Sequence, residues 1–187
     1  MPVTHPATDG WTASEYIEIK NLGFGSTPTL RSRSGVTSSG HKYHYYSDGS
    51  GSVSKGSADD ALNEWSIDCV RDKMSDKREC KVVGSQLAII YGNGSTPQLV
   101  CALKHDFPGR TGAMRIDQSP PITTGRNGCI PAAGVMSRLL KAQRVTVRVY
   151  HFPYDYPADA EESLAGFKDA HELVAHIRAR VDKLSFE

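Results

Sequence analysis

The sequence lacks the features that identify membrane-spanning and nucleic-acid-binding proteins. No stretch of the 187 residues approaches the roughly 18 consecutive apolar residues that a transmembrane helix requires. The 22 basic and 21 acidic residues nearly cancel, which leaves a formal net charge of +1. No strong overall field therefore attracts a polyanion. We expect a chain without a membrane span and without a nucleic-acid partner.

A secretory signal is also not visible in the first ten residues. They are polar and contain proline, with neither a basic region nor an apolar core. If a signal peptide has been removed, we expect a periplasmic or cell-envelope protein. Otherwise we expect an organellar or cytoplasmic protein that works within a complex.

Motifs for catalysis, phosphate binding and metal binding are missing as well. The sequence has no G-x-S-x-G nucleophile elbow, no phosphate-binding loop and no cysteine pair at the two-residue spacing of zinc or redox motifs. We therefore expect no enzyme activity, no catalytic residues, no cofactor and no metal site. One alternative is a hydrolase that uses His105 and Asp106, which follow a predicted central strand and could belong to a catalytic triad.

The four cysteines are Cys69, Cys80, Cys101 and Cys129. An even number permits two disulfides, in any of three connectivities. A Cys69–Cys80 bridge would close a loop of about a dozen residues and stabilise the fold by up to roughly 3 kcal/mol. The alternative is four buried thiols, because cysteine is among the most frequently buried residues.

What the sequence does contain predicts a mainly β fold. The 17 glycines and 10 prolines favour a chain rich in turns. The clearest strand is Arg144–Phe152, in which Val145, Val147 and Val149 alternate with polar residues. Similar patterns predict strands at Ser14–Lys20, His41–Tyr46, Glu64–Val70, Cys80–Val83, Gln86–Tyr91, Gln98–Lys104 and Ala113–Asp117, and a short helix at Val135–Leu140.

The glycine- and serine-rich stretch Asp48–Gly56 is predicted to be a turn or flexible linker. On this interpretation residues 1–60 form an N-terminal β-rich segment or extension. Residues 61–187 then form the main domain, which begins near Leu62 and places Trp65, Ile67 and Cys69 on one face of its first strand.

The C-terminal region is predicted to be an amphipathic helix. Its apolar residues recur at three- and four-residue steps and form one stripe of about five turns. The stripe either packs on the protein's own sheet or docks a partner. A second candidate contact surface is the rigid aromatic segment Pro153–Pro157. The candidate partner-binding residues are Phe167, Val174, Ile177, Val181, Leu184, Tyr154 and Tyr156.

Several short motifs occur in a fixed order between Trp65 and Ala170. They are EWSIDC at Glu64–Cys69, CKV at Cys80–Val82, the turn Pro108–Gly109, RID at Arg115–Asp117, NGC at Asn127–Cys129 and SLAGFKDA at Ser163–Ala170. This ordered set resembles the invasion-associated locus B family of bacterial envelope proteins. The resemblance covers a little over half of the chain.

The resemblance implies a β-sandwich-like domain without established catalytic residues, tied to the bacterial envelope and to contact with host cells. Family members usually carry another cysteine shortly before the NGC cysteine, and this sequence does not. By this comparison Cys129 either pairs with Cys101 or stays free.

The sequence thus predicts a mainly β, β-sandwich-like domain with a C-terminal amphipathic α-helix. Its expected function is non-enzymatic binding of other proteins. An alternative is a structural accessory subunit of a large complex, which could be membrane-associated. The hydrolase with a His/Asp site is a second alternative, and the oligomeric state is left open.

Overall fold

The computed structural model describes residues 11–19, 30–56, 63–92 and 96–180, and for residues 11–19 it describes the backbone alone. No helix of this described part is long and apolar enough to cross a membrane. The strands are β1 (Trp11–Ile19), β2 (Leu30–Thr37), β3 (Lys42–Tyr46), β4 (Ser50–Ser54), β5 (Glu64–Arg71), β6 (Arg78–Val83), β7 (Leu87–Tyr91), β8 (Pro97–Ala102), β9 (Ala113–Ile116), β10 (Ile122–Thr123), β11 (Cys129–Pro131), β12 (Arg144–His151) and β13 (Tyr154–Ser163). The helices are the short η1 (Ala132–Gly134) and α1 (Met136–Leu139) and the longer α2 (Phe167–Arg180).

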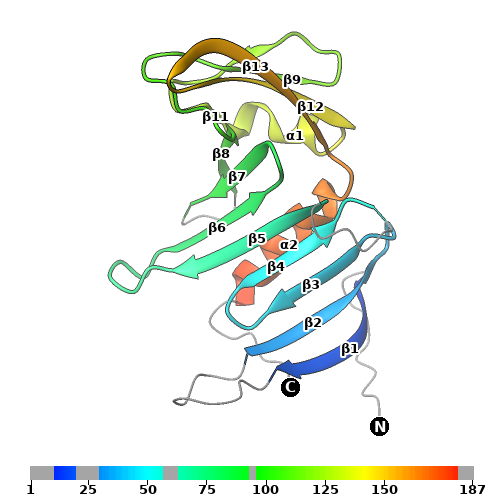
Figure 1. The fold of residues 1–187 in the computed structure, drawn as a ribbon. Coiled ribbons are helices and arrows are strands. Elements are labelled where there is room, and N and C mark those ends of the chain that lie inside the picture. The colour runs from blue at the N-terminus through cyan, green and yellow to red at the C-terminus, as the bar shows by residue number, and fades with distance from the viewer. Residues whose placement is uncertain (1–10, 20–29, 57–62, 93–95, 181–187) are drawn as a thin grey trace.

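The strands form two antiparallel sheets. The large sheet has nine strands in the order β1-β2-β3-β4-β5-β6-β7-β8-β11, and the small sheet has four in the order β10-β9-β12-β13 (Figure 1). From β1 to β8 each strand pairs with the next in sequence, as in a meander. The small sheet packs on the large one through Val145, Val147 and Met114, which are buried in one continuous core. The predicted β-sandwich-like class with a C-terminal helix is confirmed.

Helix α2 covers the middle strands of the large sheet, where it lies against β4, β5 and β6 (Figure 1). The ring of Trp65 on β5 packs against that of Phe167, with 5.0 Å between their centroids, and its Nε1 donates to the carbonyl of Ala165 at 2.8 Å. Gly166 precedes the helix with a φ of +70°, and a Cβ there would lie 2.5 Å from the carbonyl oxygen of Ser54. Only glycine fits this close approach without strain.

Both disulfides join residues that lie directly opposite each other on neighbouring strands. Cys69 on β5 bonds Cys80 on β6, and Cys101 on β8 bonds Cys129 on β11. The predicted Cys69–Cys80 bridge is confirmed, and the alternative of four free thiols is wrong. The second bridge closes the longer loop, with a sequence separation of 28 against 11. It ties β11, at the end of the large sheet, to the strand beside it.

The prediction of a linker at Asp48–Gly56 is wrong. Residues 50–54 form β4, which lies inside the large sheet between β3 and β5. A Cβ at Gly51 would lie 2.7 Å from the carbonyl oxygen of His44, so the chain needs a residue without a side chain at this point. Small residues here reflect close packing rather than flexibility. Residues 30–56 consequently share one sheet with the predicted main domain.

A buried charge cluster joins the two sheets. Glu162 on β13 is only 1% exposed and forms an ion pair with Lys55, which follows β4. Its other oxygen accepts hydrogen bonds from the Ser85 hydroxyl at 3.0 Å and from the backbone N–H of Gln86. The Lys55 ammonium also lies 4.6 Å from the centroid of the Trp65 ring. The small sheet, and β13 in particular, is therefore held in a fixed position on the large sheet.

Candidate functional site

The β12–β13 hairpin ends in an exposed group of aromatic rings, which we call the hairpin patch: Phe107, Phe152, Tyr154 and Tyr156. Phe152, Tyr154 and Tyr156 are 59%, 57% and 61% exposed, whereas Phe107 is half-buried. The rings form two pairs, Phe107 with Phe152 and Tyr154 with Tyr156, with centroids 6.0 and 5.7 Å apart. Among the residues that the structure describes, every exposed large aromatic side chain belongs to this patch.

An arginine fixes one side of the patch. The guanidinium of Arg110 forms a two-pronged hydrogen bond with Asp155, with Nε 2.6 Å from Oδ1, and lies 5.4 Å from the centre of the Tyr150 ring. These hydrogen bonds lower the pKa of the Asp155 carboxyl and raise the pKa of Arg110. Both groups therefore stay charged over the physiological pH range. The pair ties the loop after β8 to the start of β13.

Asp106 fixes the other side. Its Oδ1 accepts a hydrogen bond from the backbone N–H of Phe152 at 2.7 Å and lies 2.9 Å from Nδ1 of His151. The peptide bond between Phe152 and Pro153 is cis. The turn that carries Phe152 is thus held by side chains of a loop more than forty residues earlier in the chain.

His105 has a structural role that does not support the hydrolase alternative. Its Nδ1 accepts a hydrogen bond from the backbone N–H of Tyr150 at 3.1 Å, so its Nε2 carries the proton and donates to the Arg110 carbonyl at 3.1 Å. Asp106 instead contacts Phe152 and His151. Both ring nitrogens of His105 are used by the backbone, and neither is free to act as a general base.

The predicted partner-binding residues separate into three groups. Tyr154 and Tyr156 lie in the hairpin patch and are exposed. Phe167, Val174 and Ile177 are fully buried against the protein's own sheet. This is the alternative in which the helix stripe packs within the protein. The docking interpretation therefore does not hold for these three. The last two, Val181 and Leu184, lie outside the described residues.

Phe107, Phe152 and Arg110 are residues of this site that the sequence did not identify. The sequence pattern places Phe152 at the end of the predicted strand Arg144–Phe152, although its position in the aromatic run from Tyr150 to Tyr156 is a usable signal. Phe107 and Arg110 reach the patch only through the fold, because their loop lies beside the hairpin in space.

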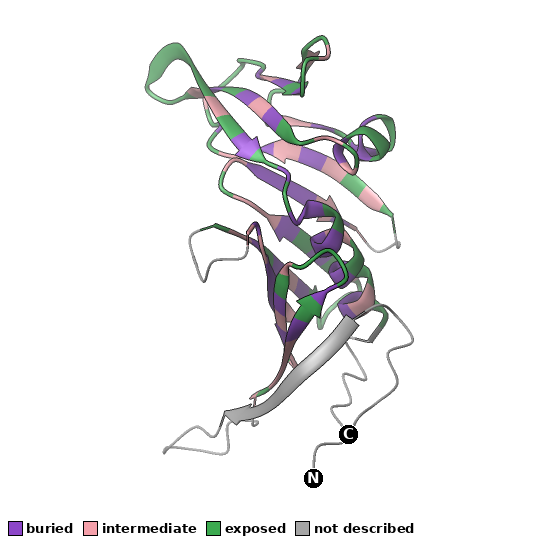
Figure 2. Cartoon of the chain, turned by 90° about the vertical axis from the view of Figure 1, so that its right-hand side faces the viewer, coloured by how far each residue is buried: buried purple, intermediate pink, exposed green. Residues whose placement is uncertain are grey.

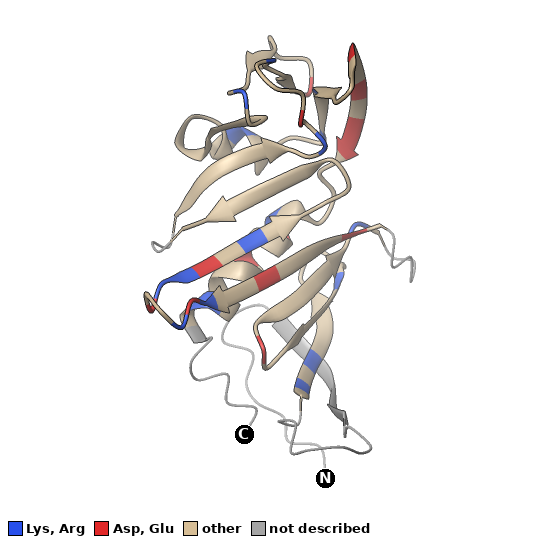
Figure 3. Cartoon of the chain, turned by 60° about the vertical axis from the view of Figure 1, so that its left-hand side comes forward, with Lys and Arg blue, Asp and Glu red and all other residues tan. Residues whose placement is uncertain are grey.

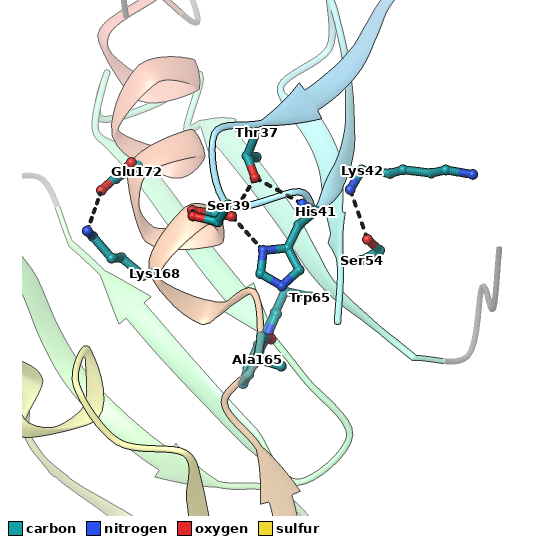
Figure 4. Close-up of polar contacts among 10 residues, drawn as sticks. Thr37, Ser39, His41, Lys42, Ser54, Trp65, Ala165, Lys168 and Glu172 are labelled. Carbon is teal, nitrogen blue, oxygen red and sulfur yellow. Dashed lines mark hydrogen bonds and ion pairs between the residues drawn. The ribbon is translucent and has the colours of Figure 1, made fainter. Parts of the chain in front are cut away.

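A second polar cluster, at the N-terminal turn of α2, is structural. Thr37 and Ser39 donate hydrogen bonds to Asp169 at 2.7 and 3.2 Å, and Nδ1 of His41 lies 2.7 Å from the same carboxylate. Figure 4 shows Thr37, Ser39 and His41 converging on this turn from the β2–β3 connection. Within the described ranges, no group of three or more His, Cys, Asp or Glu residues is arranged to hold a metal ion.

Fold and site together define a mainly β protein: two packed antiparallel sheets, two disulfides, one covering helix and an exposed aromatic hairpin. Comparisons with models of known protein families, with curated proteins and with solved structures find no match. The resemblance to the invasion-associated locus B family accordingly depends on the ordered sequence motifs alone.

Proposed function

We propose that the chain is a non-catalytic protein-binding domain and that the hairpin patch is its docking surface. The observation that carries this proposal is the clustering of three exposed aromatic rings, Phe152, Tyr154 and Tyr156, at one end of one hairpin. Aromatic residues dominate the binding energy of protein interfaces, where they fill pockets on the partner. Isolated exposed apolar residues need no such explanation, but three exposed aromatic residues within five positions of one hairpin do.

The rigidity of the patch supports the same proposal. Asp106 holds the backbone at Phe152, and Arg110 holds Asp155 between the two tyrosines. A surface that is already ordered loses little conformational entropy when a partner binds, so more of its contact energy appears as affinity. The exposed ion pairs at the margin of the patch resemble the polar rim of a protein interface.

The compartment we propose is oxidising and extracytoplasmic, because two disulfides persist there and are rare in reducing cytosol. The ordered motifs that resemble invasion-associated locus B proteins favour the bacterial envelope. A partner that stays bound through purification would instead favour an accessory subunit of a larger complex.

Site-specific photo-crosslinking tests the docking surface. A benzophenone amino acid replaces Tyr154 in one variant and Met74 in a matched control, since Met74 is 97% exposed on the β5–β6 turn and does not belong to the hairpin patch. In the cells that produce the protein, we expect one dominant protein adduct from position 154 and none from position 74. Adding Tyr156→Ser should reduce the yield at 154. Equal adducts at both positions, or none at either, would contradict the proposal.

A further inference from the structure

β13 has an open edge. It is the last strand of the small sheet and pairs only with β12, and no strand of the described chain pairs with its other side. Figure 2 shows most of its length as exposed. Native proteins usually shorten or cover such an edge, because its unpaired N–H and C=O groups can pair with another extended chain.

The hydrogen bonds of β12 show which backbone groups of β13 are unpaired. The carbonyl of Arg144 accepts from the N–H of Asp117, and the carbonyl of Tyr150 accepts from the N–H of Asp106. Both carbonyls thus point away from β13. In an antiparallel strand the N–H and C=O of one residue point to one neighbouring strand, and those of the next residue point to the other. The backbone groups of even-numbered residues of β12 therefore point toward β9, and those of odd-numbered residues point toward β13.

The partners of those odd-numbered residues exchange hydrogen bonds with β12: Ala158, Ala160 and Glu162. The intervening residues of β13 direct their backbone to the open edge: Pro157, Asp159, Glu161 and Ser163. Proline fits the first of these positions because it has no N–H. At a position whose backbone faces β12, a proline would remove a hydrogen bond of the sheet. The edge thus offers N–H and C=O groups at every second residue after Pro157, roughly 7 Å apart.

The charge of β13 indicates what kind of strand would fit. The strand contains four acidic residues and no basic ones (Figure 3): Asp155, Asp159, Glu161 and Glu162. The first three each face an arginine of their own chain, yet their side chains remain 44%, 48% and 56% exposed. A second copy of this strand would bring like charges together, whereas a strand with lysine or arginine would complement them.

We propose that the open edge of β13 binds an extended, basic segment of a partner protein as a fifth, antiparallel strand of the small sheet. This inference depends on the proposed function, because it names the chemistry of the partner at the same hairpin. Tyr154 and Tyr156 lie where the edge begins and can receive apolar or cationic side chains of the segment. Backbone pairing provides affinity, and the acidic side chains select the charge.

A synthetic peptide can test the backbone pairing directly. The probe is a capped, fluorescein-labelled peptide of about ten residues in which lysine and valine alternate, with binding measured by fluorescence anisotropy. In antiparallel pairing, directly opposite residues place their side chains on the same face of the sheet, so the lysines should lie opposite Asp159 and Glu161. Because the backbone groups of Asp159 and Glu161 point to the open edge, the N–H groups of these lysines point to β13. N-methylation of the lysines should weaken binding at least tenfold, and N-methylation of the valines should not. Replacing lysine by glutamate should abolish it.

Two substitutions at one position test the same edge from the protein side. Glu161→Ala and Glu161→Pro both remove the carboxylate, but only proline also removes the edge N–H. Neither substitution removes a hydrogen bond to β12, since the backbone N–H and C=O of Glu161 point to the open edge. We expect the proline variant to bind the lysine–valine peptide on the order of tenfold more weakly than the alanine variant. Circular dichroism checks that both variants fold. If the proline variant does not fold, binding of the methylated peptides to the wild-type protein still tests the strand pairing.

The results separate this inference from the proposed function. If the two methylated peptides bind equally, or the unmodified peptide does not bind at all, strand addition is wrong. A protein adduct from position 154 that persists in Glu161→Pro would leave the hairpin patch as a docking surface that works through side chains alone. The absence of an adduct when the crosslinker at position 154 is the only change in the protein would instead contradict the proposed function itself.

Discussion

Replacing Glu162 by glutamine removes the carboxylate that joins the small sheet to the large one. The change leaves the Lys55 ammonium buried, 7% exposed as a residue, without its counter-charge. Breaking a buried ion pair by removing one partner typically destabilises a protein by about 3–5 kcal/mol, because the remaining charge is desolvated and unpaired. Against a total stability of roughly 5–15 kcal/mol, this is a large fraction.

A double-mutant cycle measures the interaction itself. Glu162→Gln and Lys55→Met should each lower the free energy of unfolding by about 3–5 kcal/mol, measured by urea denaturation followed by circular dichroism. The double variant leaves no unpaired charge, so it should be destabilised by less than the sum of the two, with a coupling of about 2–3 kcal/mol. Additive effects, or single losses below about 1 kcal/mol, would refute the description of the cluster as a buried, coupled pair.

Two further predictions concern the covering helix. Burial lowers the pKa of His171, whose Nδ1 lies 2.6 Å from the Tyr91 hydroxyl oxygen. Unfolded His171 therefore binds a proton at higher pH than the folded form, so the free energy of unfolding should fall as pH drops below about 6.5, and His171→Phe should flatten this dependence in urea titrations. Gly166→Ala should lower the free energy of unfolding by about 1–3 kcal/mol and lower the melting temperature with it, because alanine would be strained at positive φ and would also contact Ser54. An unchanged melting temperature would contradict this close contact.

Much of the fold could be predicted because local patterns determine it. The alternation of Val145, Val147 and Val149 identified β12, and the stripe containing Phe167 and Ile177 identified α2. Both patterns report which side of an element is buried. β4 was missed because its glycine and serine residues satisfy a packing constraint between neighbouring strands, and the same composition also occurs in linkers.

The candidate site was harder to predict because its contacts are distant in sequence. His105 and Asp106 are adjacent in the chain and suggested a catalytic pair, yet their bonds go to Tyr150 and Phe152, 45 and 46 residues later. The sequence also left open whether the stripe of α2 faces the sheet or a partner. Only the arrangement of the sheet shows that Phe167 is covered by Trp65, whereas Tyr154 is left exposed.

Strand β13 combines a structural role and a proposed binding role through its two-residue periodicity. Glu162 points inward and fixes the strand to the large sheet, and its neighbour Glu161 points outward. Substitutions at the two positions should therefore have separable effects. Loss of Glu162 should reduce stability throughout the domain, whereas loss of Glu161 should change recognition at the edge with little change in stability, because its ion pair with Arg144 is exposed and 3.6 Å long. An edge anchored in this way is presented to a partner already ordered, which lowers the entropic cost of adding a strand.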